Sequence, residues 1–203
     1  LSIDRSLKGA VKGKVVMITG GSSGIGEAAA IRIAEAGGKV IVVARDEEKL
    51  ADVRKKITDA GGFVKTYSCD ITEYAANDKL AKDVLKEFGH VDVLMNNAGR
   101  SIRRSLALSY DRFHDFERTM QLNYFACVRL TMNLLPSMTS RKSGHVINVS
   151  SIGVLTNAPR FSSYVASKAA LESFARCAAS EFHDEGVHFT IINMPLVRTP
   201  MIA

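Results

Sequence analysis

The sequence contains no tryptophan and only three cysteines. Cys69, Cys127 and Cys177 lie far apart and form no Cys-x-x-Cys pair, so they suggest neither a disulfide framework nor a zinc site. The five histidines form no His-x-x-x-His or His-Cys cluster, and such clusters are the usual source of metal ligands. We therefore expect buried thiols and no metal ion.

Long hydrophobic runs are also missing. The apolar run within 39–44 is far too short to span a bilayer, and no signal peptide opens the sequence. We expect a chain without a membrane span, located in the cytoplasm. Its 203 residues, of which 46% are hydrophobic and 24% charged, suit a single globular domain of the α/β class.

The formal net charge is +6, but no recognised nucleic-acid motif accompanies it. The basic residues are spread along the chain, with local clusters only at 100–104 and 141–142. This distribution favours a cationic pocket for an anionic small molecule over a nucleic-acid surface. Residues 1–12 are polar, basic and without strong periodicity. We expect a linker or N-terminal extension there, consistent with an additional N-terminal domain in the same polypeptide.

Short β-branched runs alternate with longer amphipathic stretches over residues 13–203, which is typical of βαβ units and a parallel sheet. Six strands are predicted at 15–19, 40–44, 64–68, 93–96, 144–149 and 189–193. Helices are predicted at 25–36, 47–60, 74–88, 110–137 and 163–185. Right-handed crossovers then give a single-domain α/β fold with a doubly wound parallel sheet, a Rossmann fold, which binds ligands at the carboxyl ends of its strands.

A glycine-rich motif follows the first predicted strand and opens the next helix. Gly20 permits a tight turn, Gly24 lets the backbone approach a pyrophosphate, and Gly26 allows close packing of the helix on the strand. The helix N-terminus, where Ile25 lies, supplies amide donors and partial positive charge for phosphate groups. The motif, Thr19-Gly-Gly-Ser-Ser-Gly-Ile-Gly26, therefore predicts a dinucleotide site.

Tyr164 and Lys168 lie four residues apart in a segment rich in helix formers, so both side chains project from one helix face. A free tyrosine has a pKa of ~10, and bringing it to neutrality requires roughly 4 kcal/mol. A unit charge at ~5 Å in a medium of effective dielectric ~20 supplies about 3 kcal/mol. We predict that Lys168 lowers the pKa of Tyr164, which then moves a proton. Such pairs also arise by chance on surface helices, so the interpretation depends on the residues before them.

Asn96-Asn97-Ala98-Gly99 ends the fourth predicted strand, and Ser151 precedes Tyr164 by thirteen residues. Together with the glycine motif, these residues resemble the short-chain dehydrogenase/reductase superfamily from about residue 13 to the end. The resemblance implies an enzyme that transfers hydride between a nicotinamide cofactor and a carbonyl group.

The resemblance also implies a role for each member of the catalytic set. Ser151 donates a hydrogen bond to the substrate carbonyl, Tyr164 gives the proton and Lys168 anchors the ribose of the cofactor. Asn123 holds a water that resupplies protons. Ser150 is the nearest alternative to Ser151, but the spacing to Tyr164 selects Ser151, and we expect Ser150 to serve the backbone.

Further cofactor contacts follow from the same resemblance. Asp70 and Ile71 correspond to the adenine contact, although Asp70 is equally suited to cap a helix. Asn97 is expected to hydrogen-bond across the strand ends as well as border the cofactor, and Leu196 stands where the family usually has glycine. The remaining predicted contacts border the cofactor or bind the nicotinamide carboxamide: Ala98, Gly99, Pro195, Val197 and Thr199.

The end of the second predicted strand indicates which cofactor is bound. An NAD site usually has Asp or Glu there, but this chain has Ala44 followed by Arg45. Without the carboxylate a 2′-phosphate is not repelled, and a guanidinium pairs with it bidentately. We predict NADP, with Ser22 and Ser23 as additional phosphate donors. The alternative is that Arg45 is an incidental surface residue.

The substrate is indicated by a narrower resemblance. Segments 100–105, 110–118, 151–161 and 194–203 look like the carboxyl-terminal reductase domain of bacterial fatty acyl-CoA reductases. This implies NADPH-dependent reduction of a long-chain acyl-CoA to a fatty aldehyde, with Arg100, Arg103 and Arg104 near the CoA phosphates unless they form a solvated surface run. The alternatives are a 3-oxoacyl or hydroxysteroid-type ketone reductase and a module that senses NADP without turnover.

The resemblance carries two expectations about the whole protein. Family members are commonly homo-oligomers, and we expect the helices predicted at 110–137 and 163–185 to form the contact. Members also continue into a substrate-covering lid and a last strand, which we expect this chain to lack after residue 203.

Overall fold

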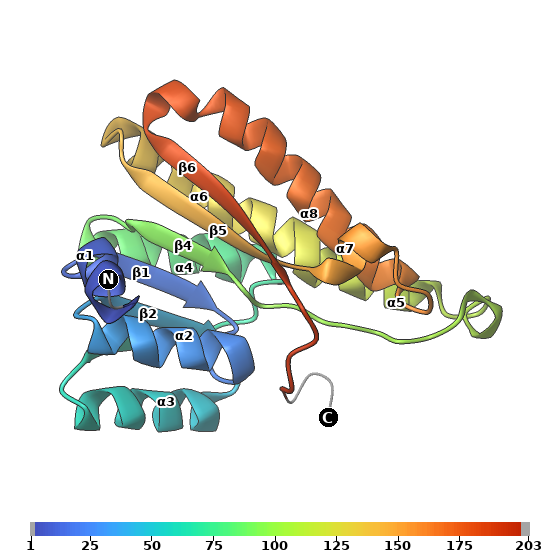
Figure 1. The fold of residues 1–203 in the computed structure, drawn as a ribbon, viewed down its shortest axis with the longest axis horizontal. Coiled ribbons are helices and arrows are strands. Elements are labelled where there is room, and N and C mark those ends of the chain that lie inside the picture. Colours follow the sequence, from blue (N-terminus) through green and yellow to red (C-terminus); the bar gives the residue numbers. More distant parts are fainter. Residues whose placement is uncertain (1–2, 200–203) are drawn as a thin grey trace.

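The computed structural model describes residues 3–199, so the parts of the predicted extension and nicotinamide segment at 1–2 and 200–203 lie outside the described residues. One parallel sheet of six strands organises the fold, in the order β3-β2-β1-β4-β5-β6 (Figure 1). The strands are β1 (Val15–Thr19), β2 (Lys39–Ala44), β3 (Phe63–Ser68), β4 (Val93–Asn96), β5 (Gly144–Ser151) and β6 (Val187–Met194). The predicted single-domain, doubly wound Rossmann fold is confirmed, and its strand order reverses between β1 and β4.

Helices cover both faces of this sheet. They are α1 (Ile3–Val11), α2 (Gly24–Glu35), α3 (Glu47–Asp59), α4 (Tyr74–Phe88), α5 (Phe113–Met120), α6 (Cys127–Ser140), α7 (Ile152–Thr156) and α8 (Ser162–Glu181). Short helices of other types are η1 (Leu106–Leu108), η2 (Gln121–Ala126) and η3 (His183–Glu185).

The hydrophobic core has two layers because side chains of a strand alternate between its faces. Val16 and Ile18 of β1 pack in one layer with residues of α2 and α3. Val15 and Met17 pack in the other with residues of α4 and α6. Both layers are buried, which explains why the strands read as continuous apolar runs.

Helix α1 lies within residues 1–12, where a linker or N-terminal extension is predicted. Val11, at its end, is buried, and the helix contacts α2. Its apolar residues Ile3, Leu7 and Val11 recur every fourth position, a helical spacing that is a usable signal.

The helix predicted at 110–137 is also different in the structure. It begins at Phe113, and a π-helical segment, η2, separates α5 from α6. The helix predicted to reach 185 ends at Glu181 and is followed by η3. Strand β5 extends to Ser151, two residues further than predicted, and this extension carries Ser151 to the rim of the site.

Candidate active site

Two adjoining hollows lie at the carboxyl ends of the strands. The larger, of about 660 Å³, is lined by predicted cofactor contacts: Gly20, Ser22, Ser23, Gly24, Ile25, Arg45, Asp70, Ile71, Asn97, Ala98, Gly99 and Thr199. The smaller, of about 240 Å³, is lined by Ser151, Tyr164, Lys168, Pro195, Val197 and Thr199 among others. Gly26 and Asn123 line neither hollow. Residues far apart in the sequence thus form one continuous site.

The glycine loop is held in a shape that only glycine adopts easily. Gly20 and Gly24 have φ angles of 64° and 58°, in the region that L side chains rarely occupy. A Cβ on Gly26 would lie 2.4 Å from the carbonyl oxygen of Gly20 and 2.5 Å from Asn97 Nδ2. Gly26 is therefore required by packing against the loop itself and against the end of β4.

Asn97 joins the ends of β1 and β4, as predicted. Its Nδ2 donates to the carbonyl oxygens of Thr19 and Gly20, at 3.0 Å each. In return, Thr19 Oγ1 accepts from the backbone N–H groups of Asn97 and Ala98, at 3.1 Å each. These four bonds fix the floor of the larger hollow.

Arg45 and Asp70 face each other across the outer rim of this hollow. Arg45 Nη1 lies 3.5 Å from Asp70 Oδ2, and their side chains are 65% and 36% exposed. Asp70 Oδ1 also accepts from the backbone and the hydroxyl of Thr72, at 3.0 and 2.7 Å. Burial opposes ionisation, but the Thr72 hydrogen bonds and Arg45 lower the pKa of Asp70 below its ordinary value. Asp70 thus closes the turn at Thr72, and helix α4, which begins at Tyr74, is not capped by it.

Tyr164 and Lys168 project from α8 into the smaller hollow. Lys168 is buried, and its Nζ donates to the carbonyl oxygen of Val149 at 2.8 Å. Burial raises the pKa of Tyr164, and a hydrogen bond with Ser151 lowers it in part. Burial also lowers the pKa of Lys168. The predicted lowering of the Tyr164 pKa by Lys168 is therefore wrong: the pKa is raised, with burial as the largest cause and the Ser151 hydrogen bond as the opposing one.

Asn123 lies in the π-helical segment η2 and is fully buried. Its Oδ1 accepts from the backbone N–H of Arg100 at 2.8 Å, and its Nδ2 donates to the Arg100 carbonyl and to Ser167 Oγ, at 2.9 Å each. This side chain connects the loop after β4 to α8, one residue before Lys168. Single π-helical turns are frequent at functional sites, and here the turn aims Asn123 at both neighbours.

Ser151 and Ser150 point to opposite sides of β5. Ser151 Oγ accepts from the backbone N–H of Gly153 at 3.0 Å, which leaves its own proton for Tyr164 or for a ligand. Ser150 Oγ donates to Glu172 Oε1 at 2.6 Å. The expectation that Ser150 serves the backbone is wrong, since its partner is a buried carboxylate.

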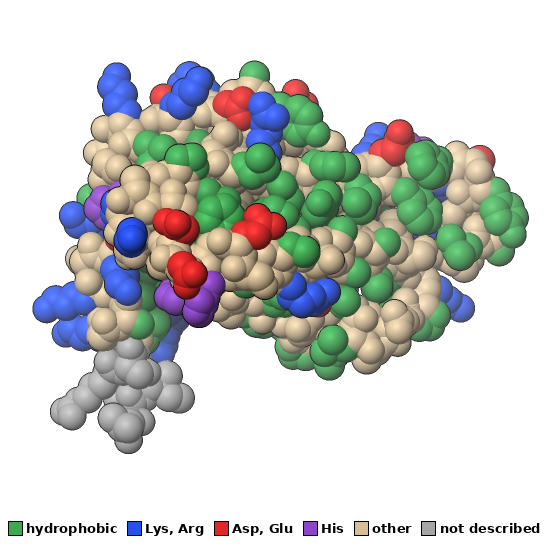
Figure 2. Space-filling model, turned by 90° about the horizontal axis from the view of Figure 1, so that it is seen from above, with side chains coloured by type: hydrophobic (Ala, Val, Ile, Leu, Met, Phe, Trp, Pro, Cys, Tyr) green, Lys and Arg blue, Asp and Glu red, His purple; other side chains and the backbone are tan. Residues whose placement is uncertain are grey.

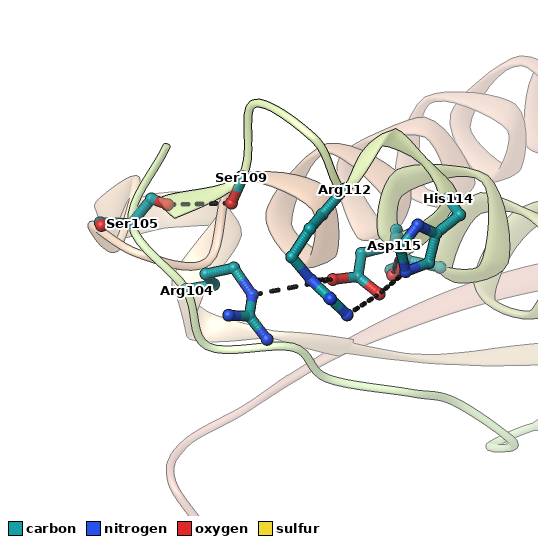
Figure 3. Close-up of polar contacts among 7 residues, drawn as sticks. Arg104, Ser105, Ser109, Arg112, His114 and Asp115 are labelled. Atoms are coloured by element: carbon teal, nitrogen blue, oxygen red, sulfur yellow. Dashed lines mark hydrogen bonds and ion pairs between the residues drawn. The ribbon is translucent and has the colours of Figure 1, made fainter. Parts of the chain in front are cut away.

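The arginines after β4 do not act as a group. Arg104 Nε lies 3.7 Å from Asp115 Oδ2, and Arg112 Nε donates to the same oxygen at 2.9 Å. Figure 3 shows Arg104, Arg112 and His114 converging on Asp115. Arg100 lines the larger hollow. Arg104 thus shares the Asp115 carboxylate with Arg112, and the expectation that Arg100, Arg103 and Arg104 lie near the CoA phosphates stays a prediction.

Sequence reasoning missed two residues beside the site, Glu172 and Asn193. Glu172 lies four residues after Lys168, a spacing that puts both on one helix face. Asn193 follows a run of β-branched residues at the end of β6, where polar side chains often border ligands. These positions made both residues candidates, but only the structure shows that Glu172 is buried.

Comparison with known proteins now places the chain. The family model for short chain dehydrogenases matches residues 14–203. The chain belongs to this family. As a short-chain dehydrogenase it is an oxidoreductase, and its fold binds nicotinamide cofactors.

Relatives of known name support this assignment. The chain is 58% identical over 193 residues to a fatty acyl-CoA reductase of Acinetobacter baylyi, covering 95% of this chain and 65% of the relative. It is 49% identical over 192 residues to a fatty acyl-CoA reductase of Mycobacterium tuberculosis, covering 94% of this chain and 65% of the relative. The chain thus spans less than two thirds of the length of either relative.

A solved structure agrees with the fold. The chain matches a metagenomic short-chain oxidoreductase in complex with NADP, with a TM-score of 0.86 and 32% identity over 91% of this chain and 83% of the other. Within the part of the chain that the structure describes, no helix has the length and apolar character needed to cross a membrane. Among the same residues, no three His, Cys, Asp or Glu side chains gather as a metal site would require.

Proposed function

We propose that this short-chain dehydrogenase uses NADPH to reduce a long-chain fatty acyl-CoA to the fatty aldehyde. The observation that carries the proposal is the 58% identity to a fatty acyl-CoA reductase over 95% of the chain, combined with Ser151, Tyr164 and Lys168 around one hollow. Since the chain covers only part of that relative, the activity of the whole protein is included in the proposal.

The larger hollow suits NADP by size and by charge. The glycine loop offers backbone with no side chain in the way, and α2 begins at this loop and directs amide donors at it. Ala44 presents no carboxylate, and Arg45 stands exposed at the rim beside Ser22 and Ser23. A 2′-phosphate there would take over the Arg45 guanidinium from Asp70, a charge-assisted pairing.

The cofactor, when bound, supplies the hydride. Ser151 Oγ is placed to donate to the substrate carbonyl, since its lone pair already accepts from Gly153. Tyr164 gives the proton: its phenol is protonated at neutral pH even at the ordinary pKa of ~10, and it lines the same hollow as Ser151. In balance, one hydride and one proton convert the thioester into an aldehyde and a free thiol.

Lys168 and Asn123 act behind these two groups. Lys168 lies on α8, and its ammonium binds the carbonyl of Val149 in β5. We assign it to hold the cofactor ribose. The Asn123 amide binds both Arg100 and Ser167 and so joins the loop after β4 to α8. We assign it to hold the water that resupplies protons to the site. We further propose that the protein is a homo-oligomer in the cytoplasm. The proposal also includes a lid and a last strand after residue 203 and a further N-terminal domain.

The test is an activity screen of the purified protein with NADPH. Acyl-CoA, fatty aldehyde and 3-oxoacyl substrates are compared by loss of NADPH absorbance, and release of free thiol is measured in parallel. Reduction of acyl-CoA with one thiol released per NADPH supports the proposal. Turnover of 3-oxoacyl substrates alone identifies a ketone reductase, and NADPH binding without any turnover identifies a sensing module.

A further inference from the structure

Glu172 is a buried carboxylate that the proposed chemistry does not use. It lies on α8, and the residue is only 4% exposed. A carboxylate away from water is costly unless hydrogen bonds replace its hydration. Its partners therefore indicate why this position carries a charge.

Every partner of Glu172 is a hydrogen-bond donor. Oε1 accepts from Ser150 Oγ at 2.6 Å and from Asn193 Nδ2 at 2.7 Å, and Oε2 accepts from Arg176 Nη1 at 3.3 Å. Asn193 and Arg176 contribute only N–H groups, and the Ser150 hydroxyl lies at the same oxygen as Asn193. These donors replace the hydration that the buried carboxyl group has lost.

These contacts continue a series along the end of β5. Lys168 Nζ binds the carbonyl of Val149, and Glu172, one helical turn later, binds the hydroxyl of Ser150. Asn193 Nδ2 donates both to Glu172 and to the carbonyl of Ser151, at 2.7 and 3.2 Å. Three successive residues of β5 are therefore tied to α8, directly or through Asn193.

We propose that Glu172 is a positioning residue that sets the place of Ser151 relative to Tyr164. Ser151 stands at the last position of β5, and Tyr164 stands on α8. The Glu172 carboxylate joins the ends of β5 and β6 to that helix, in addition to the Lys168 contact with Val149. The inference rests on the proposed reduction at Ser151 and Tyr164, and it extends that proposal to a residue that touches neither substrate nor cofactor.

The test compares three substitutions around this carboxylate. Glu172→Ala leaves the Ser150 and Asn193 donors without a partner. Glu172→Gln keeps an oxygen for both and changes only the atom that faces Arg176, which is 62% exposed and free to move away. Arg176→Ala removes the third contact alone, and is the matched control.

We expect Glu172→Ala to lower kcat by roughly 100-fold, the effect of misplacing reacting groups by ~1 Å. The KM for NADPH should change less than about threefold, because the larger hollow is untouched. Glu172→Gln should recover most of kcat, and Arg176→Ala should resemble wild type. A kcat for Glu172→Ala within about threefold of wild type overturns the proposal.

A second control distinguishes positioning of Ser151 from a general loss of stability. Ile57→Ala empties a fully buried position on α3, remote from both hollows, and lowers stability without touching the site. If kcat per folded molecule falls equally in Ile57→Ala and Glu172→Ala, positioning is overturned. Should Glu172→Ala fail to fold, Asn193→Ala breaks the same link to Ser151, and an unchanged kcat there overturns the proposal as well.

The assay uses decanal with NADPH and decanoyl-CoA with NADPH, so the substrate proposal and the positioning proposal fail separately. If Glu172→Ala loses activity toward both substrates, the positioning proposal is supported. If wild type reduces decanal but not decanoyl-CoA, only the substrate proposal is overturned. If wild type reduces neither, crystal structures of wild type and Glu172→Ala decide. Displacement of Ser151 Oγ from Tyr164 Oη supports positioning, and an unmoved Ser151 overturns it.

Discussion

Arg45 is the residue on which cofactor choice depends, and it already has a partner. Its ion pair with Asp70 spans 3.5 Å between a largely exposed Arg45 side chain and a partly exposed Asp70 side chain. Exposed pairs of this kind stabilise a protein by little, so a phosphate competes for the guanidinium at small cost. The same exposure limits what Arg45 can contribute to binding.

Arg45→Ala should weaken NADPH binding roughly tenfold. A charge-assisted hydrogen bond contributes ~1.5 to 3 kcal/mol, and we expect the lower end of this range because solvent screens the exposed guanidinium. NADH binding should stay unchanged. Fluorescence titration of both cofactors measures this, with Arg54→Ala, an exposed arginine of α3 that lines neither hollow, as control. Equal affinities of wild type for NADPH and NADH would remove the basis for the prediction.

Tyr164→Phe removes the proton donor while leaving the ring in place. We expect turnover to fall by at least ~100-fold, as is typical when a general acid is lost, with NADPH affinity unchanged. Lys168→Ala should damage both binding and turnover, because Lys168 is proposed to hold the cofactor ribose and lines the same hollow as Tyr164. Stopped-flow and binding measurements separate the two effects, and near wild-type turnover in Tyr164→Phe would show that another group gives the proton.

Helices α4 and α6 are connected at the surface by an ion pair with good geometry. Arg129 Nε and Nη2 donate to the two oxygens of Asp78 at 2.8 and 2.6 Å, and Asn133 adds a third bond at 2.9 Å. The Arg129 guanidinium also lies 4.7 Å from the ring centre of Tyr74. Hydrogen bonds from Arg129 and Asn133 lower the pKa of Asp78 to about 2.

Asp78→Asn should therefore destabilise the fold in a pH-dependent way. Because the pKa of Asp78 is lower in the folded state, the carboxylate stabilises the fold fully above the ordinary Asp pKa of 3.8. This stabilisation is lost as pH falls toward about 2. The difference in unfolding free energy between wild type and variant should be constant from neutral pH to mildly acidic pH and smaller at pH ~3. Urea denaturation measures it, and a difference that does not shrink in acid would contradict the assignment.

The elements were largely predictable because each strand is a short apolar run that glycine or a polar residue ends. The break at η2 was not, since it depends on Asn123 bonding to Arg100 and Ser167, which are distant in sequence. Glu172 was hidden for a similar reason: a glutamate in a helix usually faces solvent, and only Ser150 and Asn193 explain its burial. The glycine loop and the Tyr164–Lys168 pair were found because their spacing is local.

At the scale of the whole molecule, the outer face of the helices bears apolar side chains. Figure 2, which looks onto the α8 side of Figure 1, shows many of them among the charged groups. Phe125 on η2 and Met132 on α6 are 46% and 60% exposed. Such residues commonly mark contacts between subunits.

We predict a homo-oligomer that uses the faces of α5, α6 and α8. Sedimentation at micromolar concentration should give a mass well above the 22.0 kDa of one chain. Phe125→Ser with Met132→Ser should shift the equilibrium toward the single chain, whereas Phe63→Ser, exposed at the opposite edge on β3, should not. A wild-type monomer under these conditions would exclude the contact.

The reversal of strand order divides the sheet into two halves that meet along one seam. Strands β1 and β4 form it through three register pairs, Val16 with Val93, Met17 with Leu94 and Ile18 with Met95. The larger hollow lies across the end of this seam, between Thr19 and Asn97. We expect a dinucleotide bound there to hold the halves together and so to slow their transient separation. Cofactor supply would then govern how long the protein survives attack by proteases, and not only how fast it works.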